Sequence, residues 1–172
     1  VYARACSNGN AAGNTMTEAV LQGFFELVER DAVALWWYNR LSRPGVDLES
    51  FNEPFLLDFC DHYRKRHRRE AWALDITSDL GIPAFVAISR RLDTPQEDIL
   101  FGFGCHLEAH IALHRAFLEM NQILLNSDLH DRSADSFIEE EMTLNWLRQA
   151  TVANQPYLSP SDTLEQTVPS AH

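Results

Sequence analysis

The sequence is poor in cysteine and in long apolar runs, and each shortage excludes a class of protein. Its three cysteines, Cys6, Cys60 and Cys105, show no paired spacing, which excludes a disulfide-stapled secreted domain and predicts free thiols in a reducing cytoplasm. No stretch approaches the roughly 18 apolar residues that a membrane-spanning helix needs. We therefore expect a cytoplasmic protein without a membrane partner.

Positive charge is also scarce. The chain has 14 Lys and Arg residues against 25 Asp and Glu residues, which gives a formal net charge of −11. An acidic field of this size repels phosphate backbones, so nucleic acid is not an expected partner. The Gly-Lys-Ser/Thr signature of a Walker A loop is absent. The chain opens at Val1 inside a predicted strand, and we expect it to be part of a longer domain.

The sequence does contain the patterns of an α+β domain with a mostly antiparallel sheet. Strands are predicted at residues 1–6, 71–77, 83–90 and 99–104, and helices at 15–42, 53–66, 107–126 and 136–150. We expect the helices at 15–42 and 107–126 to pack on the sheet. One domain is predicted over residues 1–153, followed by a loosely ordered tail, rich in proline and serine, at 154–172.

The first predicted helix carries an acidic face. Thr15 and Glu18 match a capping box at its start. At about 100° per residue, Glu18, Glu26 and Glu29 fall within an arc of about 80°. Like charges at these spacings repel, and Mg²⁺ held by carboxylate oxygens beside a nucleotide would reverse the repulsion. The alternative is a solvated face on which Glu18 only caps the helix and Glu26 or Glu29 pairs with Arg30.

Residues 7–39, SNGNAAGNTMTEAVLQGFFELVERDAVALWWYN, closely resemble the central helix segment of the YcaO family. The resemblance is greatest to the branch that acts in thiazole/oxazole-modified peptide biosynthesis, whose members are called docking-scaffold or cyclodehydratase proteins. It extends through residues 74–91 to the helix at 109–122. It implies an incomplete YcaO-like domain, because the family domain is longer and its N-terminal ligands for ATP and Mg²⁺ have no counterpart here. Many members also end in PxPxP, whereas this chain ends in VPSAH.

The resemblance also implies a set of ligands. The family places Mg²⁺-binding glutamates in an E-x7-E-x2-E spacing, which this sequence repeats. By resemblance, Mg²⁺ would be bound by Glu18, Glu26 and Glu29, and ATP by Asn14, Arg30 and Arg115. For Arg115, a solvated stripe on which it pairs with Glu119 is an equally open interpretation.

The function that the resemblance implies is ATP-dependent activation of backbone amides in a ribosomal precursor peptide, with azoline rings formed from Cys, Ser or Thr. Thioamide and amidine formation are close variants within the family. The implied partners are that peptide and a ubiquitin-activating-like protein of the synthetase complex. Apolar surface left by an incomplete domain predicts a homo-oligomer. The alternatives are a docking scaffold without chemistry of its own and a structural fold with a solvated acidic face.

Two further patterns are given structural explanations. His106, His110 and His114 recur every fourth residue beside Cys105, a spacing that can bind zinc, but no carboxylate joins them and we expect a polar helix face. The basic run at 64–69 is explained as a helix C-terminus, where cations complement the dipole, rather than as a site for phosphate or an acidic peptide.

The aromatic run at residues 36–38, Trp-Trp-Tyr, is expected to belong to the core because it continues an apolar helix face. Cys6 and Cys60 have no activating neighbour in the sequence, so thiolate catalysis is not expected.

Overall fold

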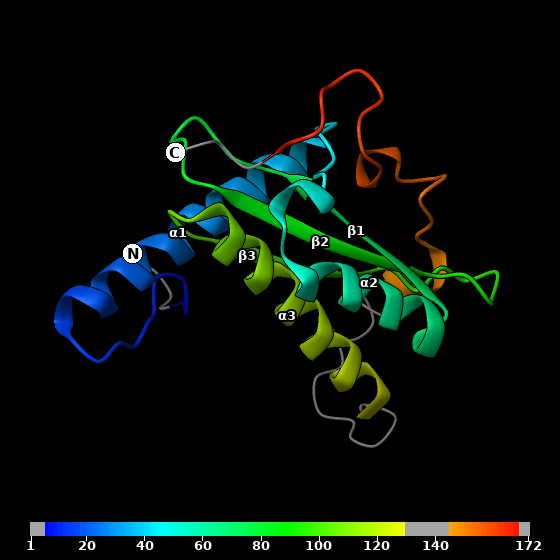
Figure 1. The fold of residues 1–172 in the computed structure, drawn as a ribbon, viewed down its shortest axis with the longest axis horizontal. Helices are drawn as coiled ribbons and strands as arrows, with labels where there is room; N and C mark the ends of the chain where they lie inside the picture. The colour runs from blue at the N-terminus through cyan, green and yellow to red at the C-terminus, as the bar shows by residue number, and fades with distance from the viewer. Residues whose placement is uncertain (1–5, 130–144, 169–172) are drawn as a thin grey trace, which may run out of the picture.

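The computed structural model describes residues 6–129 and 145–168 and confirms the α+β class (Figure 1). In chain order the elements are α1 (Met16–Asn39), the 3-10 helix Glu49–Phe51, α2 (Pro54–His67), β1 (Arg69–Asp75), β2 (Ala84–Arg91), β3 (Leu100–Cys105), α3 (Ala109–Leu129) and the 3-10 helix Pro156–Leu158. The strand predicted at 1–6 lies outside the described residues apart from Cys6, which is not in a strand. Of the helix predicted at 136–150, residues 145–149 are helical and residues 136–144 lie outside the description.

The sheet is antiparallel, as predicted, with β2 between β1 and β3. Ala87 at its centre pairs with Ala73 on one side and with Gly102 on the other. The turn between β1 and β2 includes Gly81, whose φ of +67° lies in the left-handed region that glycine adopts without strain.

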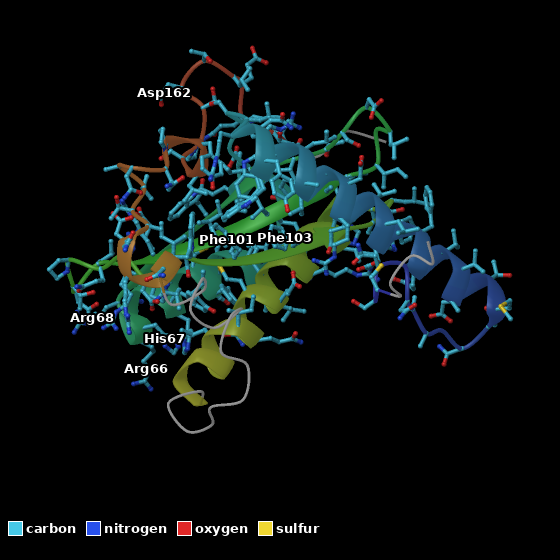
Figure 2. All side chains as sticks on the ribbon, turned by 180° about the vertical axis from the view of Figure 1, so that it is seen from behind. Arg66, His67, Arg68, Phe101, Phe103 and Asp162 are labelled. Atoms are coloured by element: carbon cyan, nitrogen blue, oxygen red, sulfur yellow. The ribbon has the colours of Figure 1, made fainter. Side chains whose placement is uncertain are left out.

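Helices cover both faces of the sheet, which explains why β2 is buried almost throughout its length. Successive side chains of a strand point to opposite faces. Val86 and Ile88 therefore pack in one core with α1, while Phe85 and Ala87 pack in a second core with α2 and α3. The three layers are visible in Figure 1, where α2 and α3 lie in front of the sheet, and in Figure 2, where α1 lies in front of it.

Two glycines of β3 bring α3 unusually close to the sheet. A Cβ atom on Gly102 would collide with the backbone of Ala116 and Met120, and one on Gly104 would collide with the carbonyl of Ala112. Because neither strand position has a side chain, the helix backbone lies directly on the strand. Because of this close contact, side chains of α3 such as Arg115 and Glu119 reach the backbone of the edge strand β3.

Helix α1 begins as predicted but ends earlier than residue 42. The Thr15 hydroxyl accepts a hydrogen bond from the Glu18 N–H at 3.2 Å, as in a capping box. The helix ends at Asn39 because Arg40 adopts φ +53°, a left-handed C-cap. The Arg40 guanidinium lies 4.7 Å from the ring centre of Tyr157 and donates to its hydroxyl, and this tertiary contact replaces the last helical turn.

The segment after residue 153 packs against the domain, whereas its composition predicts loose order. Tyr157 and Leu158 are 4% and 0% exposed and belong to the core beneath α1. The Trp72 indole N–H donates to the Leu158 carbonyl at 2.9 Å, and Val46 forms a bridge with Thr167. Tyr157 and Leu158 are therefore fixed to the core by burial, while the loosely ordered tail and the domain boundary at 153 stay predictions.

The aromatic run of α1 only partly belongs to the core. Trp36 is 1% exposed and Trp37 packs beside Phe101, but Tyr38 is 81% exposed, so its assignment to the core was wrong. One residue adds about 100° of rotation, which turns Tyr38 away from the sheet. In the described ranges, none of the helices combines the length and the apolar character needed to cross a membrane.

Candidate functional site

The acidic face of α1 meets α3 at a partly buried group of charges. The side chain of Glu29 is only 14% exposed. Burial, followed by the neighbouring carboxylate of Glu119, raises the pKa of Glu29 from 4.5 to about 7, although Arg30 and Arg115 act in the opposite direction. The Glu29 carboxyl is thus largely out of water, and Arg30 pairs with Glu26 at 3.0 Å and lies 4.0 Å from Glu29, as the alternative interpretation of the stripe expected.

Glu26, one turn before Arg30, is held by two donors. Its carboxylate accepts a hydrogen bond from the Gly9 backbone N–H and another from the Arg30 Nε at 3.0 Å. The Gly9 hydrogen bond lowers the pKa of Glu26 by more than burial raises it, and Arg30 adds to the lowering. Glu26 is therefore an ionised carboxylate of fixed orientation, whereas burial leaves the Glu29 carboxyl about half protonated near pH 7.

The α3 residues of the site are fastened to β3. Arg115 donates from Nη1 to the Cys105 carbonyl at 3.3 Å, and Glu119 accepts a hydrogen bond from the Phe103 N–H. Within the described ranges, Arg115 bonds to the strand and forms no ion pair with Glu119. Sequence reasoning gave Glu119 no ligand role, although its position one turn after Arg115 on the same face was the available signal.

The structure does not bring Glu18 and Asn14 to this group. The Asn14 N–H donates to the Glu18 carboxylate at 2.8 Å, so the Glu18 side chain reaches back to the residue before the N-cap and helps to cap α1. At a rise of about 1.5 Å per residue, Glu18 lies roughly 16 Å along the helix from Glu29. In this structure Glu18 therefore has the capping role that the alternative interpretation, a solvated acidic face, gave it.

Whether these side chains fit Mg²⁺ depends on donor chemistry. Among the described residues, no group of three or more His, Cys, Asp or Glu side chains is arranged to hold a metal ion. Mg²⁺ commonly needs only one or two carboxylates, because phosphate oxygens and water complete its octahedron. Glu29 and Glu119 fit that requirement: they are hard oxygen donors, and a cation between them would relieve their mutual repulsion.

Among the described residues, the histidines and thiols form no second group that could hold a metal ion. His114 lies 3.6 Å from Glu53 and against the Phe55 ring, while the His106 ring packs on Phe25. Burial raises the pKa of Cys105 to about 12, with a further contribution from the nearby Glu29. These contacts agree with the expected polar helix face rather than with zinc.

Burial also raises the pKa of Cys60, to about 11, so that thiol is protonated and a poor nucleophile. The basic run at the end of α2 is exposed at residues 64–66 and 68, and Figure 2 labels Arg66 and Arg68 of this run. Lys65 pairs with Asp61 at 2.5 Å. Arg69 instead is 2% exposed and bound to Asp98 and Ser89. Neither feature reaches the acidic site.

Comparison with known proteins gives matches over nearly the whole chain. The family model described as YcaO cyclodehydratase, ATP- and Mg²⁺-binding, matches residues 1–171. A protein from Rhizobium leguminosarum bv. trifolii, described as uncharacterized and encoded in the tfuA 3′ region, is 38% identical over 130 residues, which cover 70% of this chain and 31% of that protein.

Two solved structures share both fold and sequence. The heterocyclase TruD superposes with a TM-score of 0.85 at 48% identity, over 96% of this chain and 22% of that one. A heterocyclase in complex with substrate and cofactor superposes with a TM-score of 0.86 at 49% identity, over 97% of this chain and 22% of that one. The chain thus spans less than a third of the length of these relatives. With a family model covering residues 1–171, this chain belongs to the YcaO family.

Proposed function

We propose that this chain supplies part of the Mg²⁺·ATP site of a YcaO-type cyclodehydratase that forms azoline rings from Cys, Ser or Thr in a ribosomal precursor peptide. The observation that carries the proposal is the partly buried acidic pair Glu29 and Glu119, with Arg30 and Arg115 close enough to act on the Glu29 charge. Two half-buried carboxylates that repel each other are unfavourable without a cation, and two arginines near them offer charge to phosphate oxygens.

Each side chain then has a distinct task. Glu29 and Glu119 would hold Mg²⁺, with Glu26 beside them as an ionised, oriented carboxylate. Arg30 and Arg115 would balance the charge of the phosphates, since phosphoryl transfer depends on positioning and on charge stabilisation. Bound ATP would supply the phosphoryl group that turns the amide oxygen into a leaving group. The predicted ligands Glu18 and Asn14 stay proposals that require a second cation or a rearranged helix start.

The proposed partners follow from the same relatives. One of the structures most similar to this chain is a heterocyclase in complex with substrate and cofactor, which supports a peptide substrate here. We propose in addition the ubiquitin-activating-like partner protein and self-association. The apolar residues that α1 exposes, with Met16, Val20 and Leu27 at 80%, 63% and 50%, support contact with another protein surface.

Binding and turnover measurements on the complete protein test the proposal. Glu29→Gln and Glu26→Gln are expected to weaken Mg²⁺-dependent ATP binding, measured calorimetrically, and to abolish ATP turnover while circular dichroism stays unchanged. Glu165→Gln removes an exposed carboxylate elsewhere and is expected to leave both unchanged. Binding without turnover in the wild type would favour the docking scaffold. Full turnover in both site variants would refute the assignment.

A further inference from the structure

The loop that precedes α1 is seated on the helix at a position without a side chain. Gly23 lies in α1, and a Cβ atom built on it would come within 2.7 Å of the Gly9 carbonyl oxygen. Gly9 has φ +80°, and a Cβ atom there would meet the Leu27 side chain at 3.2 Å. The backbone of the loop therefore touches the backbone of the helix, and a glycine on each side makes the approach possible.

The seated loop is held at two points by glutamates of α1. The Gly9 N–H donates to Glu26, and the Asn14 N–H donates to Glu18 at 2.8 Å. A turn closed by the Asn10 N–H and the Ser7 carbonyl at 3.0 Å presents the Gly9 N–H to the helix. Figure 1 shows the loop folded back along the first half of α1. The contact at Gly23 and the bond to Glu26 lie one turn apart on α1.

We propose that Gly23 is a positioning residue of the nucleotide site: by letting the loop sit on α1, it places the Gly9 N–H where it holds the Glu26 carboxylate in its binding orientation. The role at the site rests on the proposed function. A carboxylate has about four lone-pair sites, so the Glu26 oxygen that accepts the Gly9 N–H can still bind a cation through a second lone pair. The loop thus orients Glu26 on one side while Arg30 orients it on the other.

The Gly23→Ala substitution tests whether Gly23 positions the loop or only forms part of the helix. Alanine is a better helix former than glycine, so Gly23→Ala preserves α1 while its methyl group displaces the Gly9 carbonyl. We expect the amide hydrogens of Gly9 and Asn10 to exchange about tenfold faster or more in the metal-free protein, since a hydrogen bond to a charged acceptor is worth at least that ratio. Gly9→Ala strains a left-handed position and places a methyl group against Leu27, so it disturbs the loop from its own side and should likewise speed exchange at Asn10.

Two further measurements complete the test on the complete protein. Affinity for Mg²⁺ with the non-hydrolysable analogue AMPPCP is expected to fall about tenfold in Gly23→Ala, since loss of one oriented charge contact has that effect. Thr17→Ala raises helix propensity at an exposed position of α1 away from Gly9 and is expected to change neither quantity.

The outcomes are separable. If the Gly9 amide hydrogen exchanges at the wild-type rate in Gly23→Ala, the inference is wrong. It is also wrong if this hydrogen exchanges faster while the affinity for Mg²⁺ with AMPPCP stays at the wild-type value. If the wild type itself fails to bind Mg²⁺ with AMPPCP, the proposed function fails, and the exchange result alone decides whether Gly23 seats the loop. Faster exchange together with weaker affinity supports the positioning role.

Discussion

Replacing Glu29 by glutamine is expected to stabilise the metal-free protein in a pH-dependent way. The pKa of Glu29 in the folded protein is about 7, against 4.5 for a solvated carboxyl, because burial and Glu119 disfavour its charge. Between these two pH values the folded state holds a proton that the unfolded state has released. Stability therefore falls as pH rises from about 4.5 to 7, and the loss is complete above pH 7.

The magnitude follows from the same numbers. Each pKa unit corresponds to about 1.4 kcal/mol, so a pKa raised from 4.5 to about 7 costs about 3 kcal/mol once Glu29 is ionised. Glutamine has nearly the same shape and carries no charge. Glu29→Gln should therefore recover up to about 3 kcal/mol at pH 8, and almost nothing at pH 4.5 where the wild-type carboxyl is protonated in the folded state.

Urea denaturation in the presence of a chelator, at pH 4.5, 6, 7 and 8, measures this difference directly. The free energies of unfolding of wild type and Glu29→Gln should diverge steadily with pH, while Glu165→Gln should follow the wild type. Adding Mg²⁺ and nucleotide should stabilise the wild type and reverse the order of the two proteins. A difference between wild type and Glu29→Gln that does not vary with pH would refute the argument that burial and Glu119 raise this pKa.

Two other substitutions test the packing that builds the site. Gly102→Ala inserts a methyl group into the backbone contact between β3 and α3 and should destabilise the fold by about 3 kcal/mol or more, measured by thermal unfolding; a stable, active variant would contradict the close approach. Leu158→Ala empties a fully buried position in the segment after residue 153 and should cost about 3 kcal/mol, whereas an effect below about 0.5 kcal/mol would show that this segment is loosely attached.

Local patterns in the sequence were sufficient for much of the fold. Strands β1, β2 and β3 lie within two residues of their predicted bounds because alternation and turn residues are properties of neighbouring positions. The capping box of Thr15 and Glu18 was predicted for the same reason, since its hydrogen bonds join residues three apart. The acidic stripe of α1 was equally visible from helical periodicity.

Contacts between distant segments were decided only by the tertiary structure. Periodicity shows that Glu29 and Glu119 each lie on a polar helix face, but not that α1 and α3 place these faces together at the edge of β3. That meeting depends on how closely α3 lies on Gly102, which is a matter of backbone packing. The burial of Tyr157 and the contact of Gly9 with Gly23 are likewise invisible locally, because each joins a segment whose composition predicts only loop to the helix α1. A sequence specifies which face of an element is polar or apolar, whereas the shapes of the packed elements decide which faces meet.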